Sequence, residues 1–195
     1  MDVETLLRRH PAIRGVELVG SRARGDETEL SDWDFLIRTD DVAAVVDALP
    51  DLLAPLDPLA AQWDRLSEEA TYYMLILRDG VKVDFVVQRP PKLEPPWVVE
   101  RSSLAGIDAH LWDWILWLGG KQLRGDEALV KSMLEKALYE HLLAPLGAAR
   151  PPQSIADAVE LYQTARSQRE REFGIDVSRE LEHAVYPRLE AAGLV

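Results

Sequence analysis

The first half of the chain carries short runs of apolar and β-forming residues, and in the second half apolar residues recur at helical spacing. A short apolar run predicts a strand over residues 15–19, and a further strand is predicted over residues 32–38. Residues rich in β-formers predict a strand over 71–77, and alternation of apolar and polar residues predicts one over 81–87. Helical spacing predicts a helix over residues 4–10, ended by Pro11, and another that runs from a cap at Asp40 or Asp41 to residue 53. Pro50 is a candidate break in that second helix. Asp79-Gly80 is typical of a type I′ turn and predicts a hairpin between the last two strands.

The stretch 89–103 is rich in proline and predicts an extended connector. Beyond it the pattern becomes helical, with helices expected over residues 103–124, 126–143 and 154–173, and a last one from Asp176 or Ser178 that Pro187 shortens or kinks. The layout is an α+β fold: a mixed sheet with flanking helices, followed by a C-terminal helical bundle. The predicted domains are residues 1–98 and 99–195.

Composition narrows the class of protein. The chain has 195 residues and no cysteine, which excludes disulfides and thiolate chemistry and favours a cytoplasmic location. We expect no signal peptide, and no apolar run is long enough to cross a membrane. Lys plus Arg is 22 and Asp plus Glu is 34, a formal net charge of −12. This balance argues against nucleic-acid binding and favours a cationic partner, although acidic surplus also simply keeps proteins soluble.

Three aspartates and one turn carry the candidate chemistry. Asp32 and Asp34 lie at i and i+2 on a predicted strand, so their carboxylates share one face about 6.5–7 Å apart. That spacing suits two divalent cations about 3.5–4 Å apart. The Gly20-Ser21 turn offers a hydroxyl and backbone N–H groups that suit a triphosphate. Asp84 lies on a strand otherwise fit for a core and needs a partner or a solvated cleft, and a bound metal would be that partner. The alternative is that Asp84 is a surface acid paired with Lys82.

Gly20-Ser21, then Asp32-x-Asp34, then Asp84 resemble the nucleotidyltransferase superfamily that includes DNA polymerase β. The form Gly-Ser-Arg-Ala-Arg-Gly…Ser-Asp-x-Asp is most similar to small bacterial members, the aminoglycoside-type enzymes and the minimal nucleotidyltransferases of toxin–antitoxin pairs. The matching residues lie between about 16 and 87, and the rest of the chain matches only in layout. The resemblance implies a nucleotidyltransferase-type sheet domain followed by a helical domain, with the active site in the cleft between them.

The same resemblance implies an activity. It is the Mg²⁺-dependent transfer of a nucleoside monophosphate, most simply AMP from ATP, to an acceptor hydroxyl, with release of pyrophosphate. The acidic balance and the attached helical region favour a small cationic acceptor, such as an aminoglycoside. An aminoglycoside acceptor would imply a part in antibiotic resistance. The implied catalytic and metal-binding residues, for two Mg²⁺ ions, are Asp32, Asp34 and Asp84. The implied nucleotide-binding residues are Gly20, Ser21, Arg22 and Lys121.

Two other functions stay open at this point. One is a protein-modifying or antitoxin-type nucleotidyltransferase that transfers AMP to a partner protein, and the other is a nucleotide-binding module without turnover. The general base is also open, and the candidates are Asp84, Glu100, Asp108 and Asp113. Trp112, Trp114 and Trp117 crowd one predicted helix, either as core or with one ring lining the cleft. The sequence does not decide the oligomeric state.

Overall fold

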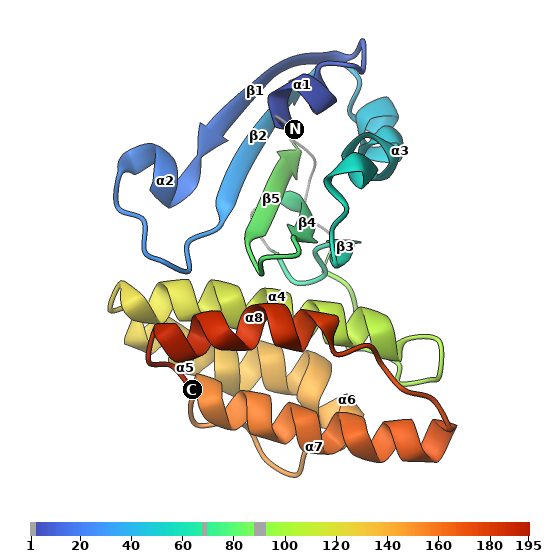
Figure 1. Cartoon of the computed structure of the whole chain (residues 1–195), viewed down its shortest axis with the longest axis vertical. Helices are drawn as coiled ribbons and strands as arrows, with labels where there is room; N and C mark the ends of the chain where they lie inside the picture. The colour runs from blue at the N-terminus through green and yellow to red at the C-terminus, as the bar shows by residue number, and fades with distance from the viewer. Residues whose placement is uncertain (1–2, 68–69, 88–92) are drawn as a thin grey trace. The chain divides into compact units, whose positions relative to one another are not determined.

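The structure, a computed structural model, describes residues 3–67, 70–87 and 93–195 (Figure 1). It divides into two compact units. The sheet unit comprises residues up to 27 together with 31–93, and the helical unit comprises residues 28–30 together with 94–195. Pro90 and Pro91 of the expected connector lie outside the described residues. The predicted α+β class is confirmed, with a mixed sheet and a C-terminal set of helices.

The sheet unit is built on five strands in the order β1-β2-β5-β4-β3. Their bounds are β1 (Ile13–Val19), β2 (Trp33–Thr39), β3 (Ala60–Trp63), β4 (Thr71–Ile76) and β5 (Lys82–Val87). Only β2 and β5 pair in parallel, and the other neighbours are antiparallel. The parallel register sets Asp34 directly beside Asp84. Strand β3 was not predicted from the sequence.

The helices of the sheet unit are α1 (Val3–Leu7), α2 (Gly20–Arg24), α3 (Val42–Leu53) and the short 3₁₀ turn η1 (Ala54–Leu56). The core of the unit joins Leu7 of α1 and Leu49 of α3 to Phe85 of β5. Asp41 caps α3, because its carboxylate accepts a hydrogen bond from the backbone N–H of Ala44 (3.0 Å). Pro50 lies inside α3, so the expected break there was wrong.

The β4–β5 hairpin forms as predicted, but its turn is not type I′. A type I′ turn needs two successive residues with positive φ. Among the described residues 76–82 only Gly80 has a positive φ, 74°. Asp79 instead uses its side chain, accepting a hydrogen bond from the backbone N–H of Val81 at 3.2 Å. The side-chain bond and the left-handed glycine close a loop one residue longer than the predicted turn, with Leu77 paired to Val81.

The helical unit contains α4 (Leu104–Leu123), α5 (Glu127–Met133), the π-helical stretch η2 (Leu134–Leu143), α6 (Ala144–Leu146), α7 (Ile155–Phe173) and α8 (Glu180–Ala191). Ser154 caps α7 by accepting from the backbone N–H of Asp157, as its sequence pattern predicted (3.1 Å). The single helix expected over residues 126–143 instead changes from α to π geometry at Leu134. Across the described residues, no helix is both long and apolar enough to cross a membrane.

Residues 28–30 belong to the helical unit although they connect α2 to β2 in sequence. The side chain of Leu30 is buried, and a Cβ atom added at Gly119 would lie 2.8 Å from its Cδ1. The carbonyl of Glu29 accepts a hydrogen bond from Arg188 of α8 (2.7 Å). The absence of a side chain at Gly119 therefore makes room for Leu30 on α4.

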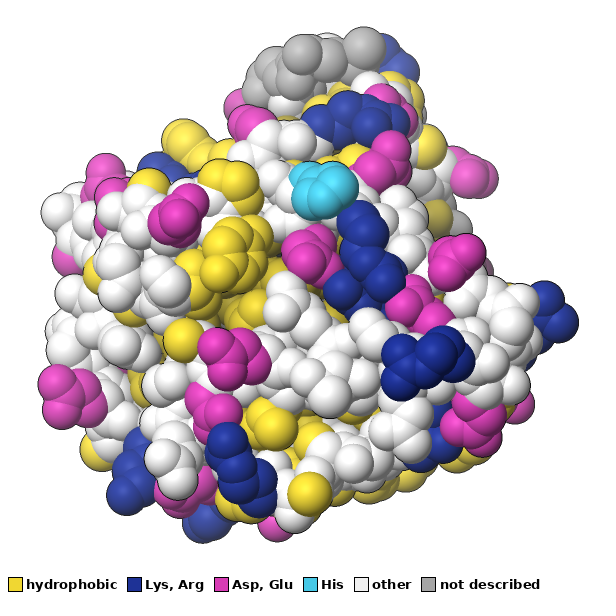
Figure 2. Space-filling view, turned by 60° about the horizontal axis from the view of Figure 1, so that its bottom comes forward, with side chains coloured by type: hydrophobic (Ala, Val, Ile, Leu, Met, Phe, Trp, Pro, Cys, Tyr) yellow, Lys and Arg dark blue, Asp and Glu magenta, His cyan; other side chains and the backbone are white. Residues whose placement is uncertain are grey.

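On the face shown in Figure 2, acidic and basic side chains lie among one another.

Candidate active site

The three predicted acids converge at one end of the parallel strand pair. Asp34 lies on β2 beside Asp84 on β5, and Asp32 immediately precedes β2. One carboxylate oxygen from each of these residues lies within 4.8 Å of the other two. The separations are short because the side chains of adjacent parallel strands stand side by side on one face of the sheet. Without a cation, carboxylates this close repel one another.

Asp84 is the most buried of the three, with 5% of its surface exposed. Burial raises the pKa of its carboxyl to about 6, the positive charge of Lys82 opposes this rise, and the negative charge of Asp32 adds to it. Its Oδ1 atom is buried and has no hydrogen-bond partner in the part of the chain that the structure describes. A buried carboxylate oxygen of this kind is left for a ligand or a cation.

Lys82 lies within the acid cluster. From the sequence, Lys82 was expected only as a possible surface partner of Asp84. Its ammonium forms an ion pair with Asp84 and lies 3.7 Å from Oδ2 of Asp32. The pair does exist, but it is buried, since Lys82 is 3% exposed.

Asp64, just after β3, is a further acid whose charge raises the pKa of Asp84. The sequence missed Asp64 because it predicted no strand there.

Gly20 and Ser21 open α2 directly beside Asp34. Gly20 has a φ of 71°, and a Cβ atom at this position would lie 1.9 Å from Oδ2 of Asp34. Glycine is therefore required both by the backbone conformation and by the carboxylate next to it. The hydroxyl of Ser21 is buried and has no hydrogen-bond partner among the described residues. The turn thus carries a hydrogen-bond donor, the hydroxyl of Ser21, next to Gly20, which lies against Asp34 of the acid cluster.

Arg22 is bound within the sheet unit. Its Nε donates to the carbonyl of Asp32 (3.0 Å) and an Nη donates to the carbonyl of Ser31 (2.7 Å). Its guanidinium lies 4.4 Å from the centroid of the Trp33 ring. These contacts tie α2 to the start of β2 and give Arg22 a positioning role. Arg24 is exposed and pairs with Asp26.

Lys121 lies in α4 of the helical unit. Its ammonium lies 5.4 Å from the ring centroid of Trp117, in cation–π contact. On the same helix Trp112 is fully buried and donates from Nε1 to Asp108 (3.2 Å), while Trp114 packs against Trp117. Trp112 is therefore part of the core of the helical unit.

The base candidates in the helical unit differ in surroundings. Asp108 is buried and accepts hydrogen bonds from Trp112, from the hydroxyl of Tyr162 and from Arg166. Burial raises the pKa of Asp108 against the effect of these donors. Asp113 is buried as well, and Glu100 is exposed and accepts from the hydroxyl of Ser102 (2.7 Å). The network around Asp108 joins α4 to α7 and has a structural role.

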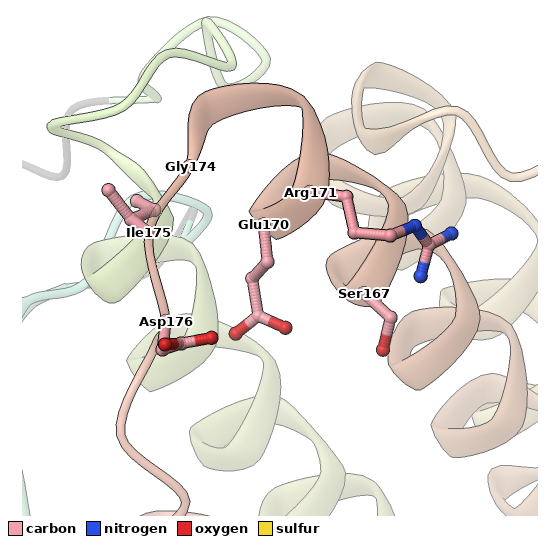
Figure 3. A pocket seen from close by; sticks show the side chains of 6 residues that line it. All are labelled: Ser167, Glu170, Arg171, Gly174, Ile175 and Asp176. Carbon is pink, nitrogen blue, oxygen red and sulfur yellow. The ribbon is translucent and has the colours of Figure 1, made fainter.

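A hollow at the C-terminal end of α7 is lined by Ser167, Glu170, Arg171, Gly174, Ile175 and Asp176 (Figure 3). The carboxylate of Glu170 is held by the backbone N–H of Val177 (2.8 Å) and by the guanidinium of Arg179 (2.7 Å). These bonds fix the loop between α7 and α8. The hollow contains none of the residues of the acid cluster.

The acid cluster fits a divalent metal. Carboxylate oxygens are the ligands that Mg²⁺ prefers, and one carboxylate oxygen of each acid lies within 4.8 Å of the others. The unpartnered Oδ1 of Asp84 supplies a buried ligand atom. Asp32, Asp34 and Asp84 are the residues that would hold it.

These features of the sheet unit agree with one class of protein. The family model of the nucleotidyltransferase domain matches residues 3–103, just over half of the chain. The chain belongs to this family, and the resemblance noted in the sequence is confirmed.

Particular relatives are more distant. A crystal structure of an aminoglycoside 6-adenyltransferase from Bacillus subtilis is similar over 100% of this chain and 97% of its own, with 11% sequence identity and a TM-score of 0.39. That likeness is too remote to carry an argument about the acceptor. The search of curated proteins found no match.

Proposed function

We propose that the protein is a Mg²⁺-dependent nucleotidyltransferase that transfers AMP from ATP to a hydroxyl of a small cationic acceptor. The observation that carries the proposal is the convergence of Asp32, Asp34 and Asp84 on one face of a parallel strand pair, beside the Gly20-Ser21 turn. Membership of the nucleotidyltransferase family supports the reaction class.

In the proposed reaction an acceptor oxygen forms a bond to the α-phosphorus of ATP, the α–β phosphoanhydride bond breaks, and pyrophosphate leaves. Two Mg²⁺ ions held by the three aspartates would supply neutralisation of the triphosphate charge. Ser21 would donate its hydroxyl hydrogen bond to a phosphate oxygen, and Gly20 allows the turn to lie against the site. The proton of the acceptor hydroxyl passes to a carboxylate, for which Asp84 is the candidate within the cluster.

The acceptor is proposed from charge. A chain with a net charge of −12 attracts cationic molecules over anionic ones, which favours an amine-bearing acceptor such as an aminoglycoside. We assign catalysis to residues 1–98, and we keep Lys121 as a proposed nucleotide-binding residue. Arg22 acts on the nucleotide through the placement of Asp32, since its guanidinium is engaged with the carbonyls of Ser31 and Asp32.

The experiment is label transfer from ATP labelled at the α-phosphate, run with Mg²⁺ and a panel of aminoglycosides, with pyrophosphate measured in parallel. The expected result is label on an aminoglycoside and an equal amount of pyrophosphate, both absent in Asp84→Asn. Label that appears only on a co-expressed protein would instead establish a protein-modifying enzyme. ATP binding without transfer to either acceptor would contradict the proposal and leave a nucleotide-binding module.

A further inference from the structure

Lys82 and three aspartates occupy adjacent positions on the two parallel strands. Trp33 pairs with Val83 and Asp34 pairs with Asp84 in the register of β2 and β5. Lys82 precedes Val83 on β5, and Asp32 precedes Trp33 at the start of β2. The period-2 geometry of a strand therefore sets Lys82 level with Asp32, on the face that carries Asp34 and Asp84. The arrangement is a cluster of four side chains, three acidic and one basic.

The lysine cannot be a solvated surface charge. It is 3% exposed, and a buried ammonium is costly unless oppositely charged groups surround it. Its Nζ atom forms an ion pair with Oδ2 of Asp84 and lies 3.7 Å from Oδ2 of Asp32. Two of the three carboxylates that fit a divalent cation thus share one ammonium. The ammonium lies among the same oxygens that a metal would use.

We propose that Lys82 is a built-in counter-cation of the acid cluster, a positioning residue that holds Asp32 and Asp84 together before metal binds and that competes with the metal for their oxygens. The proposal rests on the proposed function in that it assumes the cluster binds a divalent cation. With the ammonium present the four side chains sum to a charge of −2, which one divalent cation balances. The lysine therefore keeps the metal-free site assembled. It also makes metal binding weaker and more reversible than it would be at three carboxylates without the lysine.

The test compares Lys82→Met with Lys82→Arg in the full-length protein, with Mn²⁺ alone as the probe. Methionine keeps the length of the side chain and removes its charge, whereas arginine retains the charge. Removing a positive charge a few ångströms from the ion is expected to tighten Mn²⁺ binding by about tenfold or more, as followed by the electron paramagnetic resonance of free Mn²⁺. Lys82→Met is also expected to lower the metal-free Tm and to show a larger rise in Tm on adding Mn²⁺. Lys82→Arg should stay close to the wild type in its Mn²⁺ affinity and in its Tm. Unchanged or weaker Mn²⁺ binding in Lys82→Met would overturn the proposal.

Two further readouts keep the test decisive. If metal-free Lys82→Met is unfolded, recovery of its circular dichroism with Mn²⁺ supports the proposal, and failure to recover overturns it. If the wild type binds no Mn²⁺, the proposed function fails at its metal site, and the counter-cation role is decided without metal. In that case Lys82→Met and Asp84→Asn should each lower the Tm. The double variant should lose less Tm than the two single losses added together, because it leaves neither the ammonium of Lys82 nor the carboxylate of Asp84 without its partner. Additive losses would overturn the role of Lys82.

Discussion

The backbone of Gly20 packs directly against the carboxylate of Asp34, so closely that a Cβ atom on Gly20 would lie 1.9 Å from Oδ2 of Asp34. Gly20 also has a left-handed φ of 71°. The first residue of the turn thus fixes the position of an acid fourteen residues later in the chain. This contact gives a specific reason for glycine at the start of α2, separate from any approach of a phosphate.

We expect Gly20→Ala to lose metal binding as well as stability. Alanine in a left-handed conformation costs about 1–2 kcal/mol, which in a chain of this size lowers the Tm by roughly 2–8 °C. The added methyl group must also displace the Asp34 carboxylate, so Mn²⁺ binding should weaken sharply. The matched control is Gly25→Ala, because Gly25 has a φ of 74° with no atom within 4 Å of an added Cβ. Equal Mn²⁺ binding in the two variants would contradict a role for Gly20 in placing Asp34.

Arg22 is expected to stabilise the sheet unit. Its two hydrogen bonds to backbone carbonyls and its contact with Trp33 would each contribute about 0.5–1.5 kcal/mol. Arg22→Ala should therefore lower the Tm by several degrees, whereas Arg24→Ala, which removes only an exposed pair with Asp26, should change it little. Thermal unfolding of the nucleotide-free variants measures this. If Arg22→Ala leaves the Tm unchanged and only raises the KM for ATP, the guanidinium contacts the triphosphate instead.

Glu170 gives the helical unit a defined pH dependence. Hydrogen bonds from Arg179, and next from the backbone of Val177, lower the pKa of Glu170 from its ordinary 4.5 despite its burial. A lowered pKa in the folded state means that the stabilisation is present above pH 4.5 and is lost as the pH falls below it. Glu170→Gln should therefore cost about 1–3 kcal/mol at pH 7 and progressively less as the pH falls below 4.5.

Urea denaturation at several pH values measures the free energy of unfolding for this comparison. Glu172→Gln is the control, since Glu172 forms an exposed pair with Arg169 (2.7 Å) and should contribute under about 1 kcal/mol. A loss in Glu170→Gln that is the same at pH 7 and pH 3 would contradict an ionic role for Glu170.

Sequence reasoning recovered the elements whose signals are local. The alternation in residues 81–87, the cap at Asp41 and the Ser154-x-x-Asp157 pattern each depend on neighbours within a few residues, and the predicted elements are present. The Gly-Ser and Asp-x-Asp motifs likewise marked the family that the domain model confirms.

Features that depend on distant contacts were not recoverable. The contact of Gly20 with Asp34 follows from the antiparallel register of β1 and β2, in which Val19 pairs with Asp34. The place of the buried Lys82 beside the acids follows from the parallel register of β2 and β5. No local pattern encodes either register. Strand β3 is only four residues long and has little alternation to detect. The π geometry of η2 was not predicted either, because its buried leucines, at positions 134, 138 and 142, recur at a spacing that also fits an α-helix.

Binding of metal and nucleotide together should stabilise the protein through Asp32. A ligand that binds only the folded state raises the Tm, by an amount equivalent to about 2.7 kcal/mol at a concentration one hundred times its Kd. We expect Mg²⁺ with ATP to raise the Tm of the wild type and to leave that of Asp32→Asn nearly unchanged. Asp26→Asn serves as the control, because Asp26 is an exposed acid paired with Arg24. A rise of equal size in Asp32→Asn would refute the assignment of Asp32.

The most direct measurement is the number of Mn²⁺ ions bound per chain in the presence of a non-hydrolysable ATP analogue, followed by electron paramagnetic resonance. We expect about two ions in the wild type and fewer in Asp34→Asn and in Asp84→Asn, since each variant removes a shared ligand. A wild type that binds no Mn²⁺, or variants that bind as many ions as the wild type, would contradict the claim that these three aspartates form the catalytic metal site.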